Sequence, residues 1–214
     1  MNLRPSQLSE QGYHELATYS FDELIEMIGT EVRRRTAPVL AFWVLLALTL
    51  IAAIVANVVA IRTDGWYTLS APLLAIAGLI AVIPVHELLH AAAFRIAGAR
   101  RIRFGAKPKY LIFYAIAREF VADYREMRFI LYLPAVVISA ALVGIGVSAG
   151  PLIRVSAWWL LFFHMSACAG DFGLASFMRR HVHLGIVTGD DADDLITRFY
   201  VRTPKHGPSC TVHL

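Results

Sequence analysis

Residues 70–97 read SAPLLAIAGLIAVIPVHELLHAAAFRIA, and this stretch decides the fold. Outside the pentapeptide HELLH (86–90), its only charged residue is Arg95. An apolar run of this length is typical of a helix that crosses a bilayer. The sequence therefore predicts a transmembrane helix that carries two histidines and a glutamate.

The histidines of HELLH have the spacing of a zinc site. His86 and His90 lie four residues apart, so on a helix both imidazoles project from one face, with Glu87 beside them. Two such imidazoles can bind one Zn²⁺, and the adjacent carboxylate can accept a proton from a water molecule. Ionisable groups are costly inside a bilayer, which favours a functional site. The alternatives are polar bridges to neighbouring helices, or a short core helix of a soluble protein.

The composition indicates an integral membrane protein. Of the 214 residues, 57% are hydrophobic, and they are concentrated in long runs separated by charged segments. The net charge of +4 does not indicate a nucleic-acid partner, because the Lys and Arg residues flank the apolar runs. Two cysteines, Cys168 and Cys210, give no disulfide framework. No secretory signal peptide is expected, since the first apolar run begins near Pro38.

Four membrane spans are predicted, at 38–61, 70–97, about 129–149 and about 152–178. With four spans, three basic clusters fall on one side of the membrane: Arg33–Arg35, the 100–109 segment and Arg179–Arg180. The loops on the opposite side carry only Arg62 and Arg154. By the positive-inside rule, both termini are expected in the cytosol of a multi-pass cell-membrane protein.

Three further segments complete the predicted organisation. Residues 1–37 form a cytosolic arm, in which Ser20 and Glu23 fit a capping box before an amphipathic helix. This helix is expected to lie on the membrane surface or to pack against the protein itself, and we favour the second alternative. Residues 98–127 alternate basic and apolar residues and predict a hairpin or a small sheet. Residues 179–214 form a cytosolic tail, whose acidic run after Thr188 suits a helix N-terminus. The fold class expected is an all-α membrane protein with four transmembrane helices (domain 38–178, with a zincin-like core at 70–178) and a small β-hairpin insertion between helices 2 and 3.

A catalytic zinc usually takes three protein ligands, so a third residue is required. The metzincin pattern would place a histidine six residues after His90, but that residue is Ile96. Glu119 begins a Glu-x-x-x-Asp pattern like that of soluble zincins, although it lies in the extramembrane segment. Asp171 and His164 both lie in the fourth span.

Depth in the membrane distinguishes these candidates. Counting from cytosolic ends near 98 and 179, His86 lies about 18 Å deep, and His90 and Asp171 both lie about 12 Å deep. His164 lies about 10 Å deeper than Asp171 on the same helix. Asp171 is therefore the expected third ligand, with Glu119 as the alternative. His164 is a candidate for support of a substrate or an oxyanion, and equally for a structural hydrogen bond.

This arrangement resembles the site-2-protease class of intramembrane metalloproteases. The closer resemblance is to prokaryotic membrane proteins labelled putative zincin peptidases, in which HExxH opens a block that closes on a small-residue-Gly-Asp motif, as Ser166 to Asp171 does here. The resemblance covers about residues 80–178 of this chain. Typical site-2 proteases have Leu-Asp-Gly where this chain has Gly170-Asp171-Phe172. They commonly have an asparagine where this chain has His164.

The resemblance and the residues together predict an intramembrane zinc metalloprotease. Its expected cofactor is Zn²⁺, held by His86, His90 and Asp171, with Glu87 as the catalytic base. Its expected partners are the lipid bilayer and a membrane-embedded or membrane-proximal protein substrate. The alternative function is a non-proteolytic zinc-binding membrane protein that acts as a regulatory or assembly factor.

Overall fold

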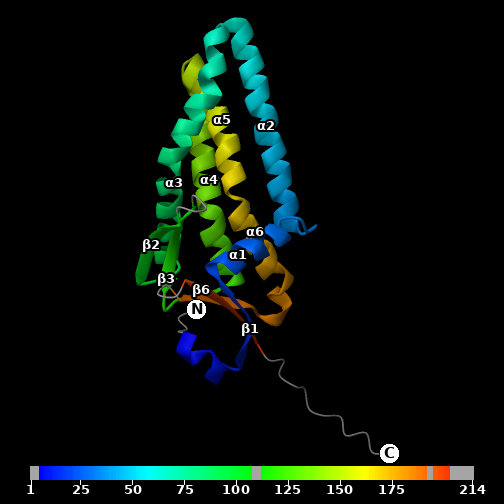
Figure 1. Cartoon of the computed structure of the whole chain (residues 1–214), viewed down its shortest axis with the longest axis vertical. Helices are drawn as coiled ribbons and strands as arrows, with labels where there is room; N and C mark the ends of the chain where they lie inside the picture. The colour runs from blue at the N-terminus through cyan, green and yellow to red at the C-terminus, as the bar shows by residue number, and fades with distance from the viewer. Residues whose placement is uncertain (1–4, 108–111, 192–194, 203–214) are drawn as a thin grey trace, which may run out of the picture.

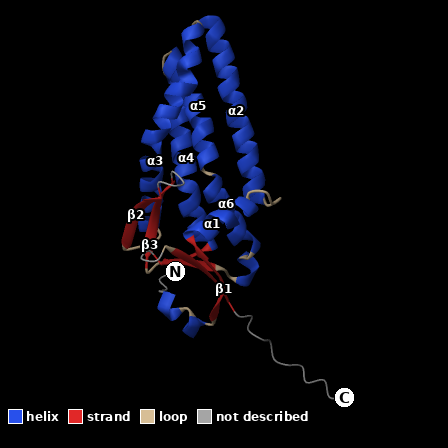
Figure 2. Cartoon of the chain, in the orientation of Figure 1, coloured by secondary structure: helices blue, strands red, loops and turns tan. Residues whose placement is uncertain are grey.

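The computed structural model describes residues 5–107, 112–191 and 195–202, and it divides into a bundle of long helices and a sheet at one end of the bundle (Figure 1). The helices run nearly parallel to the long axis of the molecule, and the strands gather below them (Figure 2). The sheet thus lies at one end of the bundle, and part of it runs beside the second apolar helix.

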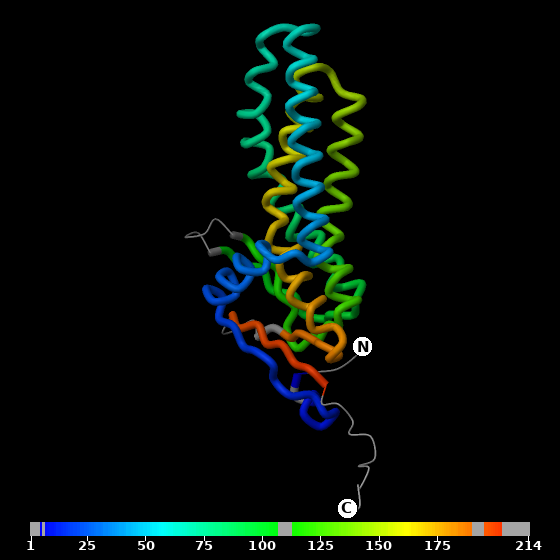
Figure 3. The backbone as a smooth tube through the Cα atoms, turned by 90° about the vertical axis from the view of Figure 1, so that its right-hand side faces the viewer, coloured from blue at the N-terminus to red at the C-terminus, as the bar shows by residue number. Residues whose placement is uncertain are grey.

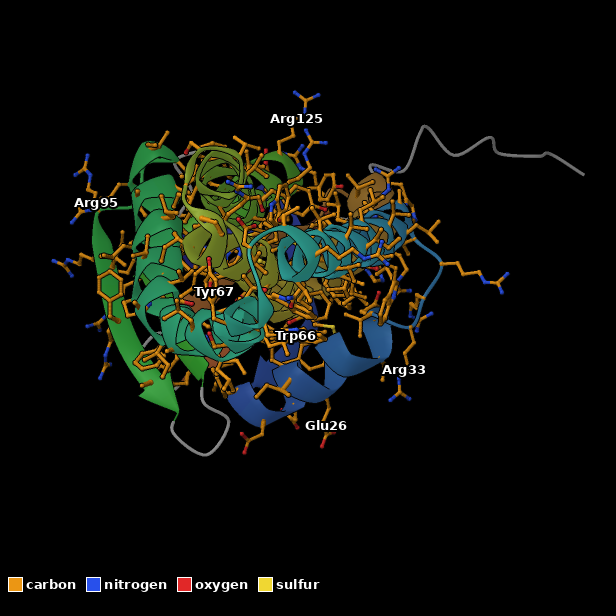
Figure 4. All side chains as sticks on the ribbon, turned by 90° about the horizontal axis from the view of Figure 1, so that it is seen from above. Glu26, Arg33, Trp66, Tyr67, Arg95 and Arg125 are labelled. Carbon is orange, nitrogen blue, oxygen red and sulfur yellow. The ribbon has the colours of Figure 1, made fainter. Side chains whose placement is uncertain are left out.

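Four helical stretches within the described ranges are long and apolar enough to cross a membrane: Ala37–Thr63, Trp66–Ile96, Tyr124–Ser148 and Pro151–Arg180. They correspond to α2 (Ala37–Thr63), η3 (Trp66–Ser70) with α3 (Ala71–Ile96), α4 (Tyr124–Ser148), and α5 (Pro151–Ala167) with α6 (Ala169–Arg180). This number and their positions agree with the prediction. Trp66 and Tyr67 are exposed at the turn between α2 and α3, at the end of the bundle far from the sheet (Figure 4).

The fourth apolar stretch is interrupted, a feature that the sequence analysis did not predict. Its two helices meet at Cys168, where the helical hydrogen bonding tightens into a turn. The helix α5 packs against α2, α3 and α4, so it occupies the middle of the bundle, whereas α6 packs against α2 and α4 (Figure 3). Because α6 starts afresh at this turn, Asp171 lies in the first turn of a helix.

The predicted hairpin is present between the second and third spans. Its strands β2 (Arg101–Lys107) and β3 (Ile112–Arg118) pair antiparallel, with Gly105 opposite Tyr114. It belongs, however, to a larger sheet of six strands in the described part of the chain, in the order β1-β6-β5-β3-β2, with β4 (Val121–Asp123) paired to β5. An all-α description therefore omits a sheet.

The additional strands come from the two terminal segments. The arm supplies β1 (Tyr13–Ser20), and the tail supplies β5 (Val187–Asp191) and β6 (Ile196–Arg202). Strand β6 pairs antiparallel with β1 on one side and with β5 on the other. The acidic run of the tail was predicted to begin a helix. That prediction is wrong for Val187–Asp191, which form a strand, and Asp193 and Asp194 lie outside the described residues. The arm and the tail thus form one sheet at the same end of the bundle.

The amphipathic helix of the arm is α1 (Phe21–Glu31), and its capping box is formed as predicted. The backbone N–H of Ser20 donates to Glu23 Oε2 at 2.8 Å, and the Glu23 N–H donates to the Ser20 hydroxyl at 3.4 Å. The hydrogen bonds from the Ser20 N–H and hydroxyl hold the pKa of the Glu23 carboxyl below its usual value. The apolar face of α1 packs on α6, where a Cβ at Gly173 would lie 2.9 Å from a methyl group of Ile28. The favoured prediction, packing against the protein itself, is confirmed.

Candidate metal centre

The two histidines of HELLH face each other near the sheet end of α3. The distance from His86 Nε2 to His90 Nε2 is 3.0 Å, and the two rings are nearly perpendicular, at 80°. Their side chains are 12% and 10% exposed, respectively. This contact follows from the helix, because residues four apart lie one above the other on the same face.

Asp171 approaches both histidines from the first turn of α6. Its Oδ2 lies 3.4 Å from His86 Nε2, its Oδ1 lies 3.3 Å from His90 Nε2, and its side chain is 13% exposed. The amino end of a helix carries a partial positive charge, which favours a carboxylate at this place. The structure therefore brings together the three residues that the sequence analysis selected as ligands.

The outer nitrogen of each histidine also has a partner. His90 Nδ1 donates to the carbonyl oxygen of Ile130 in α4 at 2.9 Å, which leaves the lone pair of its Nε2 available to a metal ion. His86 Nδ1 lies 3.1 Å from Nε2 of His164 in α5. Two helices, α4 and α5, thus hold the two imidazole rings of α3 from behind.

These residues fit a zinc ion. Ligand atoms that lie about 2.0–2.2 Å from a tetrahedral zinc lie about 3.3–3.6 Å from one another. The separations among His86 Nε2, His90 Nε2 and the Asp171 carboxylate are 3.0, 3.3 and 3.4 Å. Two imidazole nitrogens and one carboxylate oxygen are also donors that a catalytic zinc takes, with a fourth position left for water.

Glu87 lies beside His86, His90 and Asp171, which already supply the three protein ligands that a catalytic zinc usually takes. One of its carboxylate oxygens and the ligand atoms of His86 and His90 lie within 4.8 Å of one another. The backbone N–H of Ala115, in β3, also donates a hydrogen bond to the Glu87 carboxylate. The hairpin is therefore in direct contact with the residue that would act as the base.

Two adjoining cavities open onto the cluster. One of about 440 Å³ is lined by His86, Glu87, His90 and Asp171, and one of about 240 Å³ reaches from Glu87 along β3. Both have mainly apolar walls, to which α1 contributes Ile25 and Ile28. The sequence analysis missed these two residues: the apolar stripe of α1 was visible, but nothing local indicated which surface it would cover.

The remaining candidates lie elsewhere or play other parts in the geometry. Glu119, the alternative ligand, is exposed in the turn between β3 and β4, with φ at 52°, and lines neither cavity. His164 is buried behind His86, and the Sγ of Cys168 lies 3.8 Å from its Nε2. His86, His164 and Cys168 form a second group whose ligand atoms lie within 4.8 Å of one another. The suggested contact of His164 with a substrate or an oxyanion stays a prediction.

Comparison with known proteins finds one family model that matches the segment carrying these residues. The model of a family described as putative zincin peptidase matches residues 79–182, which include His86, Glu87, His90, His164 and Asp171. No curated protein and no solved structure matches the chain. Over residues 79–182, the chain is thus similar to the putative zincin peptidase family.

Proposed function

We propose that this protein is an intramembrane zinc metallopeptidase. In this proposal His86, His90 and Asp171 hold the zinc ion and Glu87 is the catalytic base. The observation that carries it is the set of separations of 3.0–3.4 Å among two imidazole nitrogens and one carboxylate, contributed by two different helices. The similarity of residues 79–182 to the putative zincin peptidase family supports the same chemistry.

The residues divide the work of peptide hydrolysis between them. A bound zinc ion supplies the Lewis acidity that activates water and polarises a carbonyl group. Glu87 accepts the proton of the attacking water and passes it to the leaving amine, for which it must lie within hydrogen-bond reach of both. The hydrogen bond from Ala115 holds its carboxylate beside the cavity and constrains its direction.

We further propose that the substrate is a membrane-embedded or membrane-proximal peptide. The site lies in helices that are long and apolar enough to cross a bilayer, close to the end that carries the sheet. The basic clusters at 33–35, 100–103 and 179–180 support a cytosolic position for that end, and hence for both termini. A lipid-exposed bundle in the cell membrane, with water reaching the site from the cytosol, follows from this orientation.

Strand β3 is the candidate element for holding that peptide. One residue pair, Arg118 with Asp190, joins β3 to β5, so the rest of this edge has no strand partner among the described residues. The Ala115 N–H points to Glu87 across this edge, and alternate residues of a strand direct their N–H groups to the same side. An extended peptide that pairs with β3 would therefore lie along the cavity next to Glu87.

Zinc content of the detergent-purified protein tests the metal centre. We expect about one zinc per chain in the wild type and in Glu119→Ala, and little zinc in His90→Ala or Asp171→Ala. Glu119→Ala is the matched control, because it removes an exposed carboxylate outside the site. Metal-free wild-type protein, purified without chelators, would contradict the proposal. Loss of zinc in Glu119→Ala instead of Asp171→Ala would contradict the ligand assignment.

Cleavage of transmembrane peptides in liposomes tests the peptidase activity. Glu87→Gln should keep its zinc and lose cleavage, because an amide cannot accept the proton of water. Phe113→Pro should lower cleavage more than Phe113→Ala with zinc unchanged, because proline removes a backbone N–H from the open edge of β3. If Glu87→Gln keeps the protein's cellular function, a zinc-binding regulatory or assembly factor is the better description.

A further inference from the structure

His164 is buried in the middle of the bundle and touches the metal centre from behind. It is 1% exposed, and its Nε2 lies 3.1 Å from Nδ1 of His86. Its other ring nitrogen, Nδ1, is also buried and has no hydrogen-bond partner among the residues that the structure describes. The ring thus contacts His86 through one nitrogen, while the other is shielded.

The two ligand histidines are supported in the same way. His90 Nδ1 donates to the carbonyl oxygen of Ile130, which can only accept. For His86, the corresponding neighbour is His164 Nε2. Each imidazole that offers Nε2 to the metal therefore has a candidate acceptor at its Nδ1, one from α4 and one from α5. Acceptors of this kind fix the tautomer and the direction of a ligand histidine.

Only one arrangement of protons is compatible with ligation by His86 Nε2. A nitrogen that binds a metal must offer its lone pair, so the proton of neutral His86 is on Nδ1. That N–H then donates to His164 Nε2, and His164 carries its own proton on Nδ1. The reverse arrangement would put a proton on His86 Nε2 and exclude it from the metal.

We propose that His164 is a positioning residue, whose Nε2 accepts the Nδ1–H of His86 and so directs His86 Nε2 at the metal. The proposal rests on the proposed function, since it supposes that His86 is a zinc ligand. A direct contact with substrate fits the geometry less well. Nε2 already faces His86, and Nδ1 is buried, although the ring lines the larger cavity.

Substitutions that keep or remove the acceptor separate the two roles. The amide oxygen of glutamine reaches about as far as Nε2 of histidine, whereas that of asparagine reaches only as far as Nδ1. His164→Leu removes the acceptor altogether. Trp159→Phe is the control for a general disturbance of α5, because it removes a different hydrogen bond, 2.9 Å long, to Asn57.

The measurement is zinc affinity, by competition with a chelator on purified full-length protein. We expect His164→Leu and His164→Asn to bind zinc about 10–100-fold more weakly than the wild type, and His164→Gln and Trp159→Phe to stay close to it. Nitrogen NMR of labelled histidines in the zinc-loaded protein should place the protons of His86 and His164 on Nδ1.

Three results overturn the positioning role. They are wild-type affinity in His164→Leu, a glutamine variant no better than leucine, and a proton on Nε2 of His164 in the loaded protein. If asparagine restores cleavage while all variants bind zinc equally, His164 acts on the substrate through Nδ1. Absence of zinc from the wild type is a separate outcome, and it contradicts the metal centre itself.

Discussion

The carboxylate of Glu31 connects the end of α1 to the end of α6 through hydrogen bonds and an ion pair. Its removal should let α1 detach from α6 more often. Its side chain is 2% exposed, and it accepts hydrogen bonds from the Ser176 hydroxyl at 2.8 Å and from two nitrogens of the Arg180 guanidinium. Arg34 adds an ion pair at 3.0 Å, but half of its side chain is exposed. The change we consider is Glu31→Ala, which removes all of these contacts.

The expected cost follows from the exposure of each partner. The Arg34 pair contributes at most about 1 kcal/mol, because it is solvated. Breaking a buried ion pair costs about 3–5 kcal/mol. We take the lower limit, about 3 kcal/mol, since Arg180 is 33% exposed and can regain water, and Ser176 keeps a partner in Thr36 at 2.8 Å. This corresponds to about a 100-fold larger population with α1 detached.

Amide hydrogen exchange of α1 in detergent measures this population. When exchange proceeds by local opening, the amides of α1 in Glu31→Ala should exchange about 100-fold faster than in the wild type. Glu26→Ala is the control, because the Glu26 side chain is exposed on the same helix and points away from the protein (Figure 4); we expect a change of about twofold or less. Equal protection in Glu31→Ala and Glu26→Ala would refute the reasoning.

Three further predictions concern other contacts. Because its hydrogen bonds lower the pKa of Glu23, the cap should stabilise α1 fully above the ordinary carboxyl pKa and lose this effect as the pH falls through the lowered value. Glu23→Gln, which cannot titrate, should remove that pH dependence from the exchange of the first turn. Gly173→Ala should lower the melting temperature despite its higher helix propensity, because its Cβ would lie 2.9 Å from an α1 methyl group. Trp159→Phe should destabilise by about 1–2 kcal/mol, and adding Asn57→Leu should recover part of this in thermal melts, since Asn57 Nδ2 has no partner in the described structure even in the wild type.

The grouping of His86, His90 and Asp171 was predictable because its signals are local or follow from helix geometry. HELLH fixes two side chains on one face of a helix. Counting residues from the charged ends of the spans then brought Asp171, 81 positions after His90, to the level of that face. The contact of His164 with His86 was not anticipated: the count compared His164 only with Asp171, which it placed about 10 Å nearer the cytosolic end, although it put His164 within about 4 Å of the level of His86. The turn at Cys168, which ends α5 and starts α6, breaks the single straight helix on which that count relied.

The sheet was less predictable, because its strands are joined across most of the chain. Tyr13 pairs with Arg202, and Arg118 pairs with Asp190, so neither partner is indicated by its neighbours in sequence. The hairpin of β2 and β3 was predicted because its strands are close in sequence and alternate in polarity. Val187–Asp191 shows the opposite case, in which acidic residues that suit a helix start form a strand between β6 and β3.

Separate parts of the chain form the candidate metal centre and one wall of the adjoining cavity, so the two can be altered independently. Every residue of the centre lies within the family segment 79–182, whereas Ile25 lies outside it, on α1, and lines both cavities. Ile25→Trp should therefore narrow the space beside Glu87, lower the cleavage of transmembrane peptides and leave zinc content unchanged. Gly29→Ala, on the same helix with open space around its Cβ, should leave both unchanged. Loss of zinc in Ile25→Trp would show that α1 supports the metal centre as well as the cavity wall.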